Sequence, residues 1–163
     1  MTQILIIDDE EPIRVLIGQI LESDGHTCLL GDSASQARKL LKDQRFDLIL
    51  CDIDMPGESG LDFIRYAVSE YPDTAAVMVT GLDDIESLEH SYQSGATDFI
   101  TKPVVWETLS HRVRYLLRAG DAIRALRQSE SRLMQAQQVA RLGNWDWDIV
   151  RDGILAGYTT NRA

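Results

Sequence analysis

Cysteine is scarce in this sequence of 163 residues, which contains only Cys28 and Cys51. The two are too far apart for a CxxC signature of metal binding or redox chemistry, and they do not suggest a disulfide framework. Cys51 lies inside an apolar run, where a buried thiol acts as a small hydrophobic side chain. We therefore interpret Cys51 as a core residue.

Long hydrophobic runs are also missing. No apolar run approaches the roughly 20 residues that a membrane-spanning helix requires. The first ten residues, MTQILIIDDE, have no basic segment ahead of their short apolar run, which ends in acids, so they do not resemble a signal peptide. We therefore expect a cytoplasmic chain with no membrane partner.

Basic residues are outnumbered, because 16 Lys and Arg face 26 Asp and Glu, for a formal net charge of −10. Such a balance disfavours direct binding to nucleic acid through the whole surface. The charge is uneven, with a net charge of −13 over residues 1–103 and +3 over residues 104–163. No helix-turn-helix pattern follows the later basic residues, which we interpret as a solvated face: Arg112, Arg114, Arg118, Arg124, Arg127 and Arg132.

Five short apolar runs alternate with helical patterns over residues 1–118. The runs cover residues 3–8, 27–30, 47–52, 75–80 and 97–100. Several of the helical patterns start with recognisable residues: Pro12 in a first turn, Ser33 with Gln36 as a capping box, and Asp83 with Glu86 as caps. The alternation predicts an α/β fold with a doubly wound five-stranded parallel sheet and helices on both faces.

Chemically active side chains follow these runs, at the sheet edge where open α/β folds form their functional crevice. They are Asp8 and Asp9, Asp52, Thr80 and Lys102. Carboxylates that converge repel one another and need a cation, and oxygen ligands without nearby Cys or His favour Mg²⁺. A lysine and a hydroxyl beside them suit phosphoryl transfer to a carboxylate. The alternative is that each side chain points separately into solvent.

Four segments, IIDDE, DLILCDIDMPGESG, MVTG and DFITKP, resemble the receiver domain of bacterial response regulators. The resemblance covers residues 1–118 and implies a flavodoxin-like fold with strand order 2-1-3-4-5. By this resemblance, Asp52 matches the phosphoacceptor. Asp8 and Asp9 match the acidic pair, with Asp9 as a direct Mg²⁺ ligand and Asp8 acting largely through water. The backbone carbonyl of Asp54 would complete the protein ligands.

The same resemblance implies the switch residues and the partners. Thr80 matches the hydroxyl that swings toward the phosphoryl group, and Phe99 matches a rotating aromatic, with a plain core phenylalanine as the alternative. Lys102 matches the phosphate-binding lysine, and its bond to Pro103 matches the family's cis peptide. The implied donor is a sensor histidine kinase or phosphotransfer protein. The implied role is a signalling domain that catalyses only its own phosphoryl transfer and dephosphorylation.

Two positions depart from the family pattern. Gly81 stands where alanine is common, which loosens the loop after the fourth strand. Asp54 places a negative side chain two residues past the acceptor, where side chains tune the phosphoryl lifetime, so we expect an altered hydrolysis rate.

Two other functions are weighed against the phosphoacceptor receiver. A constitutive pseudo-receiver interaction module is disfavoured because every acid, Thr80 and Lys102 are retained. A phosphatase of the haloacid dehalogenase type is disfavoured because its DxDx[TV] motif is missing, since Asp8 and Asp9 are adjacent.

Beyond residue 118 the spacing follows the a/d pattern of a coiled coil. The positions are Leu116, Ala119, Ile123, Leu126, Glu130, Leu133, Gln137 and Ala140. Glu130 and Gln137 weaken any pairing. We expect residues 119–141 to form a helical or coiled-coil linker that forms a homodimer. The alternative is one amphipathic helix that packs on its own domain.

The segment LGNWDWD resembles the opening of a PAS sensor domain. We therefore expect residues 142–163 to be the truncated start of a PAS-like domain that leads to an output domain in cis. By resemblance, that output is a cyclic-di-GMP enzyme with GGDEF and EAL domains or a histidine kinase. Alternatively, Trp145 and Trp147 belong to a packing hairpin of a complete small protein.

Overall fold

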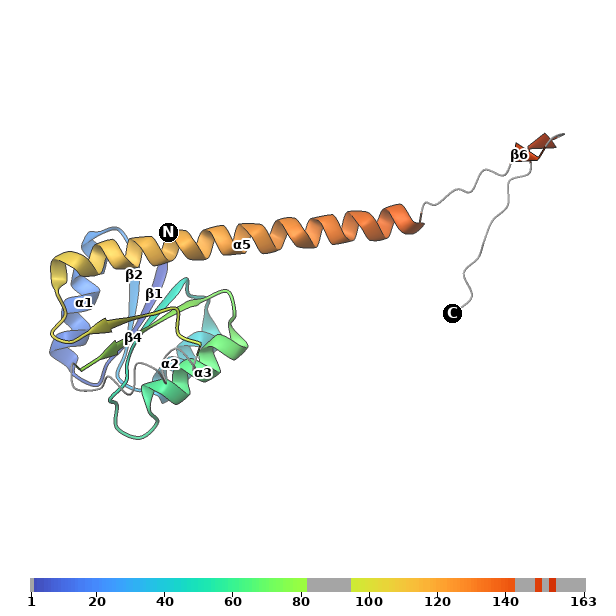
Figure 1. Ribbon diagram of the computed structural model, residues 1–163. Helices are drawn as coiled ribbons and strands as arrows, with labels where there is room; N and C mark the ends of the chain where they lie inside the picture. Colours follow the sequence, from blue (N-terminus) through green and yellow to red (C-terminus); the bar gives the residue numbers. More distant parts are fainter. Residues whose placement is uncertain (1, 82–94, 143–148, 151–152, 155–163) are drawn as a thin grey trace. The chain divides into compact units, whose positions relative to one another are not determined.

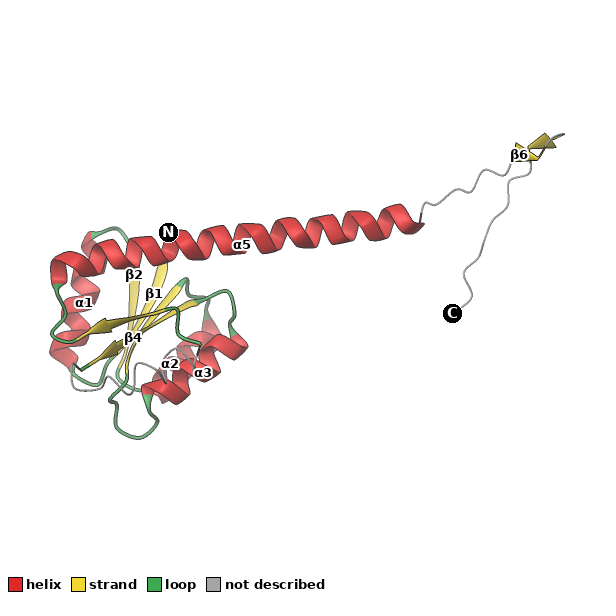
Figure 2. Cartoon of the chain, viewed as in Figure 1, coloured by secondary structure: helices red, strands yellow, loops and turns green. Residues whose placement is uncertain are grey.

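The computed structural model describes residues 2–81, 95–142, 149–150 and 153–154. Figure 1 shows strands and helices that alternate along the chain, and Figure 2 separates them by type. The elements are β1 (Gln3–Ile7), α1 (Glu11–Ser23), β2 (Thr27–Gly31), α2 (Ala34–Asp43), β3 (Leu48–Asp52), α3 (Gly60–Glu70), β4 (Ala75–Thr80), β5 (Asp98–Thr101), α5 (Trp106–Leu142), β6 (Ile149–Val150) and β7 (Gly153–Ile154). The helix expected with caps Asp83 and Glu86 lies outside the described residues.

The main sheet has five parallel strands in the order β2-β1-β3-β4-β5. This confirms the expected doubly wound α/β fold and its strand order. Because β1, β3, β4 and β5 are consecutive neighbours, their carboxyl ends lie along one edge of the sheet. In register, Ile7 pairs with Cys51, Asp52 with Val79 and Thr80 with Thr101.

Helices cover both faces of the sheet because successive strand side chains point to opposite sides. One apolar cluster joins Leu5, Ile49 and Met78 to the apolar faces of α2 and α3. The other joins Ile4 and Leu50 to α1 and the first turns of α5. All five residues of β3 are buried, as a central parallel strand requires. Cys51 is one of these core residues, as its sequence context predicts, and burial raises the pKa of its thiol well above its usual value.

The helix starts follow local sequence signals. Pro12 lies in the first turn of α1, where its missing N–H leaves no hydrogen bond unmade. Ser33 caps α2 by accepting a hydrogen bond from the Gln36 amide at 3.4 Å. The Gln36 side chain accepts from the amide of Asp32 rather than from Ser33, so the expected capping box is only half formed. Ser59 caps α3 in the same way through Asp62.

The first turns of α5 pack on the sheet through buried residues such as Val113 and Leu116. Two of the arginines expected on a solvated face also form ion pairs with the domain, and Arg112 stays exposed as expected. Arg112 contacts Asp98 at 3.3 Å, and Arg124 contacts Asp47 at 3.3 Å. These pairs hold the helix against the sheet, because Asp98 begins β5 and Asp47 directly precedes β3.

The chain divides into two compact units, Met1–Arg124 and Ala125–Ala163. The first contains the sheet and its helices. The second contains the rest of α5 and the antiparallel pair β6 and β7, in which Ile149 pairs with Ile154. Trp145 and Trp147 lie outside the described residues. Within the described ranges, no helix combines the length and the hydropathy that a bilayer crossing needs.

Candidate functional site

The carboxyl edge of the sheet brings three carboxylates together. Asp8 follows β1 and Asp52 ends β3, and these strands are neighbours in the sheet. Asp8, Asp9 and Asp52 each offer one oxygen, and these oxygens all lie within 4.8 Å of one another. Asp8 and Asp52 are buried, whereas Asp9 is exposed. The sequence-based expectation that these side chains converge therefore holds, and they do not point separately into solvent.

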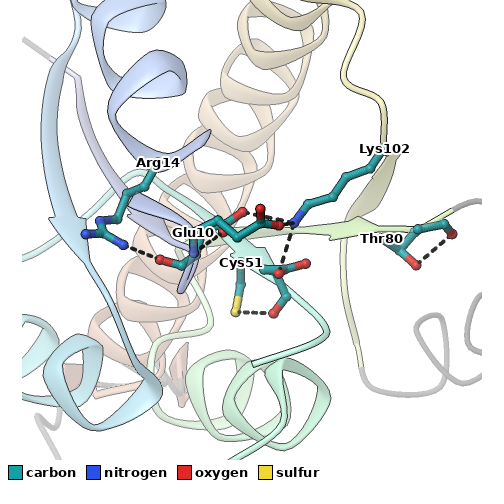
Figure 3. Close-up of polar contacts among 8 residues, drawn as sticks. Glu10, Arg14, Cys51, Thr80 and Lys102 are labelled. Atoms are coloured by element: carbon teal, nitrogen blue, oxygen red, sulfur yellow. Dashed lines mark hydrogen bonds and ion pairs between the residues drawn. The ribbon is translucent and has the colours of Figure 1, made fainter. Parts of the chain in front are cut away.

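Lys102 supplies the positive charge of this cluster. Its Nζ lies 3.0 Å from Oδ2 of Asp52 and 3.2 Å from Oδ2 of Asp8, with Oε1 of Glu10 at 3.7 Å (Figure 3). The backbone N–H of Lys102 donates to the Thr80 carbonyl at 2.6 Å, which ties the residue to the end of β4. The Lys102–Pro103 peptide bond is cis, as expected. One ammonium group thus bridges two buried carboxylates.

The pKa values of Asp52 and Lys102 are both shifted in this cluster. Burial raises the pKa of Asp52, and Asp8 adds to this, while Lys102 and the backbone of Asp54 oppose it; the net shift is upward. Burial lowers the pKa of Lys102, but the hydrogen bond and charge of Asp52, followed by Asp8, outweigh burial and raise it. Lys102 therefore stays protonated at neutral pH. Three carboxylates with one close lysine leave the cluster short of positive charge.

The donor set fits a hard divalent cation. Asp8 uses Oδ1 to accept a hydrogen bond from the Glu10 amide at 2.8 Å, and its backbone carbonyl accepts from Arg14 (Figure 3). Its Oδ2 is buried and, although ion-paired with Lys102, accepts no hydrogen bond from any described residue. A buried carboxylate oxygen with spare acceptor capacity among other carboxylates suits a Mg²⁺ site, where it can accept a hydrogen bond from water bound to the ion.

The loop between β3 and α3 is built closely around Asp52. The backbone of Asp54 favours the charged form of the Asp52 side chain and so opposes the rise in its pKa, while the Asp54 side chain is exposed. Gly57 has φ +90, a conformation that favours glycine, and the Gly60 amide donates to the Ile53 carbonyl at 3.0 Å. The loop therefore folds back on the end of β3.

Gly60 is a site residue that sequence reasoning missed. A Cβ added to Gly60 would lie 1.9 Å from the Asp52 carbonyl oxygen, so no larger residue fits without moving the backbone of the acceptor. A glycine directly after the N-cap Ser59, where helices favour better helix formers, was the one available signal.

Thr80 and Phe99 are placed at neighbouring strands but do not join the charged cluster. Thr80 is fully buried, and its hydroxyl donates to the Gly81 carbonyl at 3.3 Å, pointing away from Lys102 (Figure 3). Phe99 is half-buried and packs against the cluster on the α2 and α3 face. A Cβ added at Gly81 would meet no atom within 4 Å, so the space there does not require glycine.

Comparison with known proteins gives one consistent result. Residues 4–114 match the response regulator receiver domain family. The phosphate regulon transcriptional regulatory protein PhoB of Pseudomonas aeruginosa is 36% identical over 117 residues, covering 71% of this chain and 51% of that protein. A cyclic di-GMP phosphodiesterase of Thermotoga maritima is 30% identical over 115 residues, covering 71% of this chain and 31% of that protein.

Solved structures agree with the sequence matches. A CheY-like response regulator receiver domain protein from Methanospirillum hungatei superposes with a TM-score of 0.72 at 29% identity, covering 75% of this chain and 98% of that one. The chain spans about half the length, or less, of the curated relatives it matches.

Proposed function

The chain belongs to the response regulator receiver domain family, and from that membership we propose that Asp52 accepts a phosphoryl group beside bound Mg²⁺ and thereby switches an output. Receiver domains are signalling domains of two-component systems and are typically phosphorylated on aspartate. The convergence of Asp8, Asp9, Asp52 and Lys102 at one sheet edge supports this proposal.

The proposed chemistry assigns each group one task. Asp9, Asp52 and the Asp54 carbonyl would hold the ion, with Asp8 acting largely through water. Mg²⁺, when bound, supplies positive charge to the transferred phosphoryl oxygens. An ionised Asp52 oxygen forms the new bond to phosphorus as the bond from phosphorus to the donor's histidine nitrogen breaks. Lys102 binds a second phosphoryl oxygen through the ammonium group that now contacts Asp52.

The proposed switch uses Thr80 and Phe99. The Thr80 hydroxyl now hydrogen-bonds only weakly, at 3.3 Å, to the adjacent Gly81 carbonyl. A phosphoryl oxygen on Asp52 is a stronger acceptor, so the hydroxyl would turn toward it. Phe99 lies beside this strand in β5 and would follow into the vacated space. The surface formed by β5 and α5 would change as a result.

The proposed signalling partners are a phosphoryl donor that acts before this domain and an output that acts after it. Upstream, we assign a sensor histidine kinase or phosphotransfer protein as donor. Downstream, residues 119–141 are proposed as a linker and residues 142–163 as the start of a PAS-like domain leading to an output in cis. One relative's name describes a transcriptional regulator and another's a cyclic di-GMP phosphodiesterase, so related chains carry different outputs. We propose a cyclic-di-GMP or histidine kinase output.

The proposed homodimer forms through α5. Ile123, Leu126 and Leu133 follow the a/d spacing and are 52%, 61% and 61% exposed. Large apolar side chains at this spacing stabilise a helix pair when a second helix covers them.

Acetyl phosphate labelling tests the proposed function. With Mg²⁺, the intact mass of the full chain is expected to rise by one phosphoryl group. Asp52→Ala should abolish labelling, whereas Asp43→Asn, which alters an exposed carboxylate at the end of α2, should not. A wild-type chain that neither binds Mg²⁺ nor takes up label would favour the pseudo-receiver module instead. Labelling that persists in Asp52→Ala would refute Asp52 as the acceptor.

A further inference from the structure

Arg38, in the middle of α2, holds the loop that follows β3. Its guanidinium donates to both carboxylate oxygens of Glu58, with Nη2 at 2.5 Å from Oε1 and Nε at 3.2 Å from Oε2. The same guanidinium lies 3.7 Å from the ring centroid of Tyr66 in α3. This group of three side chains, which we call the Arg38 clamp, links α2, the loop and α3.

The Arg38 clamp restrains a loop whose position matters for the site. Residues 53–59 connect Asp52 to α3; the Gly60 amide donates to the Ile53 carbonyl at 3.0 Å, and the loop backbone at Asp54 favours the charged form of Asp52, which lowers its pKa. On one side of the turn, Met55 is buried in the core. On the other side, beyond Gly57, the loop is held by Glu58. Movement of Glu58 would therefore be transmitted to the Asp54 peptide over a few residues.

The geometry of the Arg38 clamp is better suited to fixing the position of the loop than to increasing the folding stability of the domain. The side chains of Arg38 and Glu58 are 32% and 33% exposed, and ion pairs with that much solvent contribute little to folding. A two-point guanidinium–carboxylate contact, however, fixes the orientation of both groups. Stacking on Tyr66 further restricts the guanidinium plane. Lysine could provide the charge but neither the fork nor the stacked plane.

We propose that Arg38 and Glu58 are positioning residues that hold the β3–α3 loop, so that the Asp54 peptide stays against Asp52 and the loop is ready for Mg²⁺. This inference rests on the proposed function. Arg38 and Glu58 are proposed to contact neither the metal nor the phosphoryl group. They would act by raising the affinity for Mg²⁺ and the rate of phosphorylation.

Mg²⁺ titration of the full chain, followed by amide NMR shifts, tests this assignment. Arg38→Ala is expected to weaken Mg²⁺ binding by roughly three- to tenfold, as suits a partly exposed ion pair with a stacked ring. Arg38→Lys and Glu58→Gln should fall between this variant and the wild type. Without metal, the Asp54 amide should exchange faster with solvent in Arg38→Ala, a change that unaltered loop geometry would not produce. Labelling by acetyl phosphate should slow by a similar factor.

The matched control is Arg65→Ala, which removes an ion pair with Asp62 at 3.0 Å that lies within α3 and includes no side chain of residues 53–59. It should leave Mg²⁺ affinity unchanged. If Arg38→Ala disturbs folding, the milder Arg38→Lys and Glu58→Gln variants decide. Affinity and amide exchange equal to those of Arg65→Ala would overturn the positioning role while leaving the proposed function intact. A wild-type chain without Mg²⁺ affinity would overturn both.

Discussion

Replacing Lys102 by methionine should destabilise the metal-free protein, because it leaves two buried carboxylates without their cation. The Lys102 ammonium lies 3.0 Å from Asp52 and 3.2 Å from Asp8, and those two carboxylate side chains are only 4% and 2% exposed. At an effective dielectric constant of about 20, each pair attracts by about 5 kcal/mol before desolvation is subtracted.

The net cost is smaller than the gross attraction. Removing one partner of a buried pair typically costs about 3–5 kcal/mol. Because the Lys102 side chain is 20% exposed, water can solvate part of the charge that its removal leaves unpaired, which reduces the loss of stability. We therefore expect Lys102→Met to lower the free energy of unfolding by about 3 kcal/mol at pH 7 without Mg²⁺. Added Mg²⁺ should restore part of the difference, because a bound cation neutralises the same carboxylates.

The loss should depend on pH with a definite sign. Lys102 lowers the pKa of Asp52, so its removal raises that pKa further above 3.8. A folded carboxyl with a raised pKa takes up a proton as pH falls, and the variant gains stability relative to the wild type. The difference in unfolding free energy between the wild type and Lys102→Met should therefore be largest near neutral pH and become smaller toward pH 4. Because the pKa of Lys102 is itself raised above its ordinary value of 10.5, its contribution to stability is fully present below that ordinary value and is lost only as pH rises through the higher folded pKa.

Urea unfolding followed by circular dichroism, from pH 4 to pH 8 in chelator and in excess Mg²⁺, measures this effect. Lys39→Met, at an exposed position of α2, is the matched control and should be neutral. If Lys102→Met matched Lys39→Met at every pH, the lysine would not be balancing the charge of the carboxylates, and the electrostatic reasoning would be wrong.

Three further predictions follow from the same geometry. Gly60→Ala should lower the free energy of unfolding in urea by about 1–3 kcal/mol and slow labelling, because its Cβ would lie 1.9 Å from the Asp52 carbonyl oxygen. Gly81→Ala, where the added Cβ meets no atom within 4 Å, should change neither stability nor labelling, and equal effects of the two variants would contradict the steric argument. Asp8→Asn should weaken Mg²⁺ binding at least about tenfold by calorimetry, and unchanged affinity would remove Asp8 from the site. Leu126→Asn with Leu133→Asn should convert dimers to monomers in sedimentation equilibrium, and a monomeric wild type would exclude the α5 dimer.

Much of the fold could be predicted because its signals are local. Each strand of the sheet is an apolar run, so both faces must be covered and the sheet must be parallel with helical crossovers. Once the topology is parallel, the carboxyl ends meet, and the convergence of Asp8, Asp52 and Lys102 follows. The strand order did not follow from periodicity; it came from the resemblance of the four motif segments.

The remaining features depend on contacts that no local pattern encodes. Arg38 and Glu58 are separated by 20 positions and lie on partly exposed surfaces, where periodicity does not distinguish a solvated charge from a paired one. Arg124 belongs to a row of arginines that looks solvated in the sequence, yet its partner Asp47 lies far away in the chain, directly before β3. The need for glycine at Gly60 depends on how closely α3 approaches Asp52. The hydrogen bond from the Thr80 hydroxyl to the Gly81 carbonyl is likewise invisible in the sequence.

The central claim is that Asp8, Asp9 and Asp52 gather around one divalent ion and leave an Asp52 oxygen free to attack phosphorus. A crystal structure grown with Mg²⁺ and beryllium fluoride tests it most directly. We expect the fluoride adduct on Asp52, the ion bound by Asp9, Asp52 and the Asp54 carbonyl, and Lys102 in contact with a fluorine. Ordered side chains around a pocket that holds neither group would contradict the account.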